Sequence, residues 1–319
     1  MFVNPIPTTL VDIGSYKLEM AVHGPPRQAH SPIVVIIPDI ASSIKEWAAV
    51  TRTLAESMSV VNYERAGYGK SEAAPQGDTR SAGEIAMELH TLLRVAKITP
   101  PYIVICNGYG AVVLGEFLKL RGLVQFKGFV FLNANFGDTS LTLMNPSVQA
   151  MQKDIDVLKL CYGKSHCLSD LEWDALLEED ACSEHRATAE SEIAKYRTSQ
   201  GVDSYDKFSR LEKHDLRRVP LVVLHVSSAV DIGKICAEGY RIGDGTDADK
   251  ATIRQVIDES IKTEEEVQRN LSQLSGRSKF QHVEGSGPKI QLTAPRIVAD
   301  AVTWTLMEDQ GWMMCGVPY

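Results

Sequence analysis

The stretch Tyr102-Ile-Val-Ile-Cys-Asn-Gly-Tyr-Gly-Ala111 decides the fold of this chain. Its apolar start predicts a buried strand, and the closely spaced glycines that follow predict a tight turn into a helix. Cys106, Gly108 and Gly110 stand at the marked positions of a G-x-S-x-G elbow, a turn that exposes a nucleophilic serine above a sheet. Because glycine has no side chain, Gly108 cannot attack a substrate. The pattern therefore predicts the elbow without its nucleophile.

Length and composition are those of an ordinary globular protein. The 319 residues suffice for one α/β domain with an inserted cap, and 44% hydrophobic with 23% charged residues excludes a disordered or fibrous chain. The formal net charge is −8 and no basic tract offsets it, so we expect no nucleic-acid partner.

The N-terminus and the cysteines predict a cytoplasmic protein with no membrane partner. The first seven residues lack the regions of a signal peptide, and no window approaches the roughly 18 apolar residues of a membrane span. The six cysteines form no C-x-x-C pair, so we expect reduced thiols. Cys161, His166 and Cys167 lack a second ligand pair at suitable spacing, so no metal site is expected.

Strands and helices are expected to alternate along most of the chain. Residues 8–23 alternate apolar and polar side chains as an antiparallel hairpin does, whereas 33–37 is continuously apolar, as in a strand covered on both faces. Further strands are expected at 59–63, 102–106, 128–132, 220–226 and 279–283, and helices at 41–58, 80–96, 110–121, 247–273 and 295–307. This order predicts a mostly parallel eight-stranded sheet flanked by helices, an α/β fold.

The alternation stops between about residues 138 and 219. This segment is polar, helical in periodicity and without a buried-strand run. We interpret 139–218 as a helical cap inserted after the sixth strand, with 1–138 and 219–319 forming the core.

Three motifs together resemble the α/β-hydrolase superfamily over most of the chain outside the cap. One is the elbow at 106–110. Another is Tyr63-Glu-Arg-Ala-Gly-Tyr-Gly-Lys-Ser71, which looks like the D-R-x-G-x-G-x-S turn after the fourth strand of these enzymes. The last is Glu284-Gly-Ser-Gly-Pro-Lys-Ile290, which looks like the loop that delivers the catalytic histidine. The resemblance implies an α/β-hydrolase fold with a pocket between sheet and cap.

The chain departs from this family at the positions that carry the chemistry. Gly108 stands at the nucleophile position, Pro288 at the histidine position, and Pro38-Asp39 where the oxyanion loop has His-Gly. Asp231, beyond the seventh strand, matches the triad acid but has no histidine to orient. Because several independent positions differ, the resemblance implies a hydrolase fold that lacks serine-hydrolase chemistry.

Asp39 is the candidate catalytic residue, because it lies in the loop beside the elbow. A carboxyl group in an apolar pocket has a raised pKa and can act as a general acid near neutral pH. The alternative is that Asp39 caps a helix that starts near Ala41, a position that aspartate favours.

The candidate substrate-binding residues cluster at the expected ends of strands. Ligands gather at the carboxyl ends of strands in open α/β sheets, and the N-terminus of the elbow helix favours an anion. Each of these side chains could instead be structural, by completing a turn or packing under the cap. The expected set is Asn107, Gly108, Tyr109, Asn133, Asn135, His225 and Pro288.

Other polar residues are expected to have local structural roles. His225 is interpreted either as a core histidine or as a base that works with Ser286 in a rebuilt site. His185 is expected on the solvated surface of the cap, and Glu64 and Arg65 are expected to pair with each other to hold their own turn.

The matched segments are most similar to hydrolase-like proteins of fungal secondary metabolism, through phrases such as Ile98-Thr-Pro-Pro-Tyr-Ile and Gly115-Glu-Phe-Leu-Lys-Leu. Some members of that group no longer hydrolyse and instead close rings on polyketide or prenylated aromatic scaffolds. The resemblance implies a cyclase that closes an oxygen heterocycle on a prenylated phenol by intramolecular hydroalkoxylation. Asp39 would donate the proton and the elbow amides would hold the phenolate.

Two other functions stay open. The chain could be a non-catalytic pseudohydrolase that binds a small ligand or a protein, or a hydrolase rebuilt around His225 and Ser286. For the cyclase we expect a small hydrophobic aromatic substrate, no cofactor, and a homodimer formed through the cap.

Overall fold

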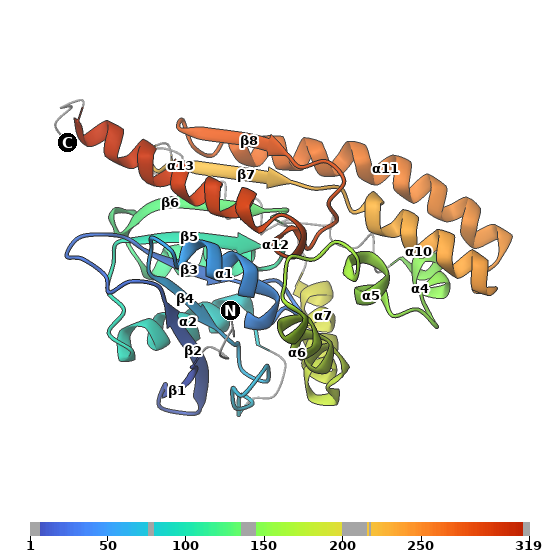
Figure 1. Cartoon of the computed structure of the whole chain (residues 1–319), viewed down its shortest axis with the longest axis horizontal. Coiled ribbons are helices and arrows are strands. Elements are labelled where there is room, and N and C mark those ends of the chain that lie inside the picture. The colour runs from blue at the N-terminus through green and yellow to red at the C-terminus, as the bar shows by residue number, and fades with distance from the viewer. Residues whose placement is uncertain (1–6, 76–79, 135–144, 200–215, 217, 315–319) are drawn as a thin grey trace.

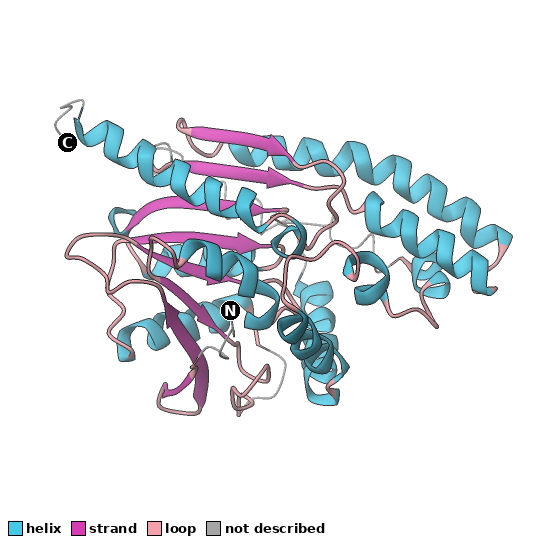
Figure 2. Ribbon diagram, in the orientation of Figure 1, coloured by secondary structure: helices cyan, strands magenta, loops and turns pink. Residues whose placement is uncertain are grey.

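Eight strands form one sheet in the computed structural model, which describes residues 7–75, 80–134, 145–199, 216 and 218–314 (Figures 1 and 2). The order across the sheet is β1-β2-β4-β3-β5-β6-β7-β8. β2 pairs antiparallel with β1 and β4, and the other pairings are parallel. The mostly parallel eight-stranded sheet expected from the sequence is confirmed. The strands are β1 (Thr9–Asp12), β2 (Lys17–His23), β3 (Ile33–Ile37), β4 (Val60–Tyr63), β5 (Tyr102–Asn107), β6 (Phe126–Leu132), β7 (Leu221–His225) and β8 (Ser278–His282).

The pairing of β3 with β5 at the centre of the sheet positions the elbow. Every residue of both strands is buried, as expected for apolar runs covered on both faces. Their parallel register ends with Ile37 opposite Cys106. The loop that follows β3 therefore begins beside the turn that follows β5.

Helices cover both faces of the sheet (Figure 2). One face packs against α2 (Ala82–Val95) and α3 (Gly110–Leu120), and the other against α1 (Ala48–Leu54) and α13 (Pro295–Met314). Trp47, at the end of the 3-10 helix η1 (Ile44–Trp47), is buried in the second layer. Two short elements complete this part of the chain, η2 (Leu123–Gln125) and α12 (Ile290–Thr293).

A helix that the sequence did not predict, α10 (Ala229–Ile242), follows β7 and precedes α11 (Asp247–Ser272). Its two internal glycines, Gly233 and Gly239, lower helix propensity, so the sequence pattern did not indicate a helix here. Gly239 is needed for packing, because a Cβ there would lie 2.3 Å from the carbonyl oxygen of Met151. Tertiary contact therefore outweighs local propensity in this segment.

The described residues between β6 and β7 include the helices α4 (Pro146–Met151), α5 (Val157–Tyr162), α6 (Asp170–Ala181) and α7 (Ser183–Ser199). Figure 1 shows α4 and α5 beside α10, with α6 and α7 apart from them. Val148 and Leu158 share an apolar cluster with Ile232 and Ile235 of α10. Part of 139–218 lies outside the described residues, so the division into core and cap stays a prediction.

Within the described residues, none of the helices has the length and apolar character needed to cross a lipid bilayer.

Substituting the glycine at the start of α3 tests the close approach of this helix to β3. A Cβ on Gly110 would lie 2.2 Å from the carbonyl oxygen of Ile37, a backbone atom that cannot turn away. We expect Gly110→Ala to lower the free energy of unfolding by about 1–3 kcal/mol, measured by urea denaturation. Gly83→Ala in α2 is the matched control, because its Cβ would meet nothing closer than 3.8 Å. It should gain up to about 1 kcal/mol from helix propensity, and equal losses in both variants would contradict the close approach.

Candidate functional site

The elbow between β5 and α3 centres on Gly108. This residue has φ +50°, in the left-handed region that L side chains rarely adopt. Its amide donates to the carbonyl of Leu132 at 3.2 Å, and its own carbonyl accepts from Ala111 at 3.2 Å. Gly108 thus lies at the top of the turn, as the glycine spacing predicts.

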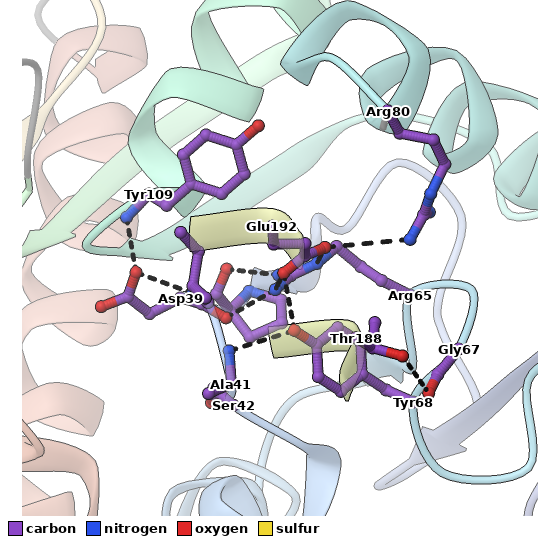
Figure 3. Close-up of polar contacts among 12 residues, drawn as sticks. Asp39, Ala41, Ser42, Arg65, Gly67, Tyr68, Arg80, Tyr109, Thr188 and Glu192 are labelled. Carbon is purple, nitrogen blue, oxygen red and sulfur yellow. Dashed lines mark hydrogen bonds and ion pairs between the residues drawn. The ribbon is translucent and has the colours of Figure 1, made fainter. Parts of the chain in front are cut away.

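The carboxyl group of Asp39 fills the space beside Gly108. Its Oδ1 accepts hydrogen bonds from the backbone amides of Ile40 and Tyr109, both at 2.8 Å, and Figure 3 shows the contact with Tyr109. A Cβ built on Gly108 would lie 2.0 Å from Oδ2 of Asp39 and 2.2 Å from its Cγ. The carboxyl group therefore takes the place that a side chain at the elbow would occupy.

The surroundings of Asp39 have opposing effects on its pKa. Loss of hydration is the largest effect and raises the pKa, whereas the amide hydrogen bonds from Tyr109 and Ile40 and the charges of Lys289 and Arg65 lower it. The net result is a raised pKa. Asp39 thus holds a proton at higher pH than an ordinary aspartate.

The helix-cap interpretation of Asp39 is wrong. The helix starts at Ile44, and its N-cap is Ser43, whose Oγ accepts from the amide of Lys45 at 3.2 Å. The amide of Tyr109, one of the elbow amides that we expected to hold a ligand anion, donates to Asp39.

Arg65 holds the loop that carries Asp39. Its guanidinium donates to the carbonyls of Pro38 and Asp39, both at 2.8 Å, and to Glu192 of α7 at 3.0 and 2.8 Å. Figure 3 shows this arrangement, in which Arg65 lies between the loop and Glu192. The predicted Glu64–Arg65 pair is therefore wrong, since Arg65 pairs across the fold with Glu192.

Further polar groups converge on Glu192. The hydroxyl of Tyr68 donates to Glu192 at 2.7 Å and accepts from the amide of Ala41 at 3.3 Å (Figure 3). Arg80 lies 3.9 Å from Glu192 and pairs with Glu88 at 2.8 Å. All four charged side chains in this network are buried.

His185 lies in the same region and is buried, so the prediction of a solvated surface position is wrong. Its Nδ1 is 3.3 Å from Glu179, its Nε2 is 3.2 Å from the carbonyl oxygen of Ala41, and its ring packs edge-on against Tyr68. His185, Thr188 and Glu192 are spaced i, i+3 and i+7, which places them on one face of α7. This polar stripe was the signal that sequence reasoning missed.

The other candidate binding residues have separate partners. Asn107 donates from Nδ2 to Gln291 at 3.3 Å, and the ring of Tyr109 packs against Tyr196 of α7 with centroids 5.3 Å apart. Asn133 has φ +43°, and its buried Oδ1 has no hydrogen-bond partner within the described part of the chain. Asn135 lies outside the described residues.

His225 and Ser286 each contact other residues of the described structure. The ring of His225 lies against Phe280 and His282, with centroids 6.1 and 5.0 Å apart. Burial lowers the pKa of His225 to about 4, so it is neutral at physiological pH. The hydroxyl of Ser286 accepts from Thr293 at 3.1 Å. These contacts give no support to a site built from His225 and Ser286.

Asp231 faces the loop that carries Pro288. A Cβ on Gly287 would lie 2.3 Å from Oδ1 of Asp231, and the Asp231 carboxylate accepts a hydrogen bond from the hydroxyl of Tyr162. That hydroxyl also accepts from the amide of Lys289 at 3.3 Å. Tyr162 thus makes the contact that a histidine would make with a triad acid.

The comparisons with known proteins agree on the fold. No protein-family model matches the chain. It is 26% identical over 304 residues to the "Probable transporter efuK" of Hormonema carpetanum, a match that covers 93% of this chain and 42% of that relative. The chain therefore spans less than half of that relative's length. It is 25% identical over 299 residues to an AB hydrolase superfamily protein of Gibberella zeae, covering 90% of each.

Solved structures resemble the chain over nearly its whole length. A protein of Acinetobacter baumannii described provisionally as a lipase has a TM-score of 0.69 at 15% identity, covering 96% of this chain and 92% of its own. Epoxide hydrolase CorEH has a TM-score of 0.59 at 14% identity, covering 95% and 99%. An esterase from Thermogutta terrifontis has a TM-score of 0.56 at 13% identity, covering 95% and 99%. At these identities the likeness is one of fold.

A double-mutant cycle tests whether Asp39 fills the space beside Gly108. Gly108→Ala should destabilise the protein, because the new Cβ must push the Asp39 carboxyl group off its two amides. In the Asp39→Ala background this steric cost disappears, and only the backbone strain at φ +50° remains. We expect a coupling energy of at least about 1 kcal/mol from chemical denaturation. Additive effects would show that the two groups do not contact.

Neutralising Glu192 tests the buried ion pair. Glu192→Gln leaves the guanidinium of Arg65 buried without a full counter-charge, so we expect a loss of about 3 kcal/mol in the free energy of unfolding. Glu238→Gln removes one charge from the solvent-exposed pair with Arg241 and should cause no measurable loss. If the two variants are equally stable, the Arg65–Glu192 pair does not support the loop.

Proposed function

The chain has the α/β-hydrolase fold, and from this premise we propose that it is a non-hydrolytic, cofactor-independent cyclase with Asp39 as its general acid. The observation that carries the proposal is the Asp39 carboxyl group in the space beside Gly108. An acid with a raised pKa stands where this fold usually presents a nucleophile. Such a group can transfer a proton without forming an ester intermediate.

The proposed substrate is a small hydrophobic phenol that carries a prenyl alkene. A proton moves from Oδ2 of Asp39 to one alkene carbon, and the phenol oxygen bonds to the other. The phenol proton then returns to Asp39, so the reaction adds the O–H group across the alkene and needs no co-reactant. Oδ2 suits this step, because it forms no hydrogen bond within the residues that the structure describes, and Asp39 is partly exposed.

The two amides on Oδ1 support the acid role. When Asp39 loses its proton, the amides of Ile40 and Tyr109 already point at the oxygen that gains charge. The N-terminus of α3 adds a partial positive charge at the same place. The elbow thus stabilises the conjugate base of the acid, in place of the oxyanion of an acylated substrate.

The magnitudes suit an enzyme without a nucleophile. General acid catalysis contributes about 10²–10⁴-fold, and orienting two groups of one substrate contributes about 7–11 kcal/mol. Together these effects are large enough for ring closure at a useful rate.

A second candidate, a ligand-binding protein without turnover, is favoured by one observation. The amide of Tyr109, which stabilises an oxyanion in hydrolases of this fold, is bound by the protein's own carboxylate. An assay for ring closure of a prenylated phenol separates the two functions, because a binding protein returns its ligand unchanged.

Asp39→Asn tests the proposal, since asparagine keeps an oxygen for the amides and removes the acidic proton. We expect ring closure of a prenylated phenol by the wild-type chain to give one stereoisomer, and the variant to lower kcat by at least about 10²-fold. Asp156→Asn is the control, because Asp156 caps the distant helix α5 and should leave kcat unchanged. Racemic product at the buffer rate from the wild-type chain would contradict the proposal.

The pH dependence of kcat shows whether Asp39 acts as a general acid or as a general base. A general acid works in its protonated form, and burial raises the pKa of Asp39. The wild-type kcat should therefore be highest at low pH and fall as pH rises through this raised pKa. A kcat that instead rises over that range would identify Asp39 as a base.

A further inference from the structure

The structure has a cavity of about 530 Å³ whose lining residues include neither Asp39 nor Gly108. It is bounded by the strands β2 and β4, the start of α1 with η1, and the helix α6. Its size falls within the roughly 300–1,000 Å³ of small-molecule sites. Ile40 and Tyr109, whose amides bind the Asp39 carboxyl group, are not among its lining residues, so the cavity is a separate place on the fold.

Two residues that line the cavity have buried acceptor atoms that receive no hydrogen bond from the described residues. Oε2 of Glu64 and Oδ1 of Asn62 have no hydrogen-bond partner in the described structure, and both residues are at least nine-tenths buried. Their other polar atoms are used, because Oε1 of Glu64 accepts from Ile44 at 3.0 Å and Nδ2 of Asn62 donates to Thr51 at 2.7 Å. Asn62 lies in β4 and Glu64 follows the end of this strand, and both residues line the cavity.

The other carboxylates around the cavity already have cations. Glu179 pairs with Lys45 at 2.6 Å, and Glu172 pairs with Arg52 at 2.5 Å. Glu19 lies 3.5 Å from the ammonium of Lys70 and accepts from its amide at 2.7 Å. Among the described residues, Glu64 has no ion-pair partner. The wall therefore lacks one donor with positive charge.

Part of the cavity wall is apolar. Ile44 and Ala48 line it from one side, and Leu171 and Ala175 of α6 line it from the other. A hydrocarbon chain would bury its surface there, while a donor group would satisfy the acceptors.

We propose that this cavity binds an alkylammonium cation, with the ammonium group on Glu64 and Asn62 and the alkyl chain against α6 and η1. An ammonium supplies up to three donors and a full positive charge, whereas a neutral alcohol supplies one donor and no charge. The charge-assisted hydrogen bond to a carboxylate is the stronger of the two.

The surroundings of Glu64 add a pH dependence. Burial and the negative charges of Glu179 and Glu19 raise its pKa to about 8, while Lys45 lowers it. His23 and Lys70 also line the cavity, and burial lowers the pKa of His23, which favours its neutral form. Because Glu64 with a pKa of about 8 is mostly protonated at pH 6 and half ionised at pH 8, binding of a cation should tighten about fiftyfold between these pH values. Alkylamines stay charged over this range.

The test is calorimetric titration of the full chain with n-hexylamine and with its neutral counterpart 1-hexanol. We expect one saturable site for hexylamine at pH 8 and at least tenfold weaker binding of hexanol. Equal binding of the two would show an apolar cavity without ammonium recognition. Lack of hexylamine binding at millimolar concentration would overturn the proposal.

Matched variants locate the site. Glu64→Gln keeps the oxygen that accepts from Ile44 and removes the charge, so hexylamine should bind at least tenfold more weakly. Glu172→Gln removes the same charge from a cavity carboxylate that is already paired with Arg52, and should change binding less than threefold. If both variants lose the same hexylamine affinity, the ammonium responds only to the overall negative charge of the cavity and not to Glu64 in particular.

A third variant keeps the test decisive if Glu64→Gln does not fold. Ala175→Phe places a ring in the cavity from α6, a partly exposed helix position, and should abolish binding of hexylamine and hexanol alike. Its thermal denaturation should resemble that of the wild type. Unchanged hexylamine binding in Ala175→Phe would place the ligand elsewhere and refute the proposal.

Discussion

The contact between the Asp39 carboxyl group and Gly108 is the constraint on which the site depends. A side chain at position 108 and this carboxyl group cannot occupy the same space, since a Cβ there would lie 2.0 Å from Oδ2. The contact exists because β3 and β5 are parallel neighbours that end together, at Ile37 and Cys106. The same amides that would polarise a substrate carbonyl bind an internal acid. At the elbow, the backbone amide of Tyr109 thus binds a carboxyl group of the protein itself.

The acid also depends on a distant part of the chain. Arg65 binds the loop carbonyls of Pro38 and Asp39, and Glu192, 127 residues further on, balances its charge. A buried guanidinium is costly without a counter-charge, so the loop and α7 are stabilised together. Arg65 therefore connects α7 to the loop that carries Asp39. The helices between β6 and β7 thus help to position the site.

Two glutamates of one cavity show how strongly surroundings change the same functional group. Hydrogen bonds from His185 and Lys45 lower the pKa of Glu179 to about 2. Burial raises the pKa of Glu64 to about 8, because it has one amide donor and two acidic neighbours. The first carboxylate is satisfied by the protein, whereas Oε2 of the second has no hydrogen-bond partner among the described residues. Because both residues are glutamates, the residue type alone would not reveal this difference in pKa.

The sequence by itself determined the strands, most of the helices and the turn at Gly108. Buried strands require continuous apolar runs such as 33–37, and a sharp elbow requires glycine, so both leave a local pattern. The helix α10 was not predicted because its glycines lower helix propensity, and one of them, Gly239, is needed for the close contact with α4. Asp39 was identified as a candidate from its loop, but its bond to Tyr109 joins residues 70 apart. Tertiary structure alone decided that partnership, together with those of Arg65, His185 and Glu64, because pairings between distant side chains leave no periodic pattern in the sequence.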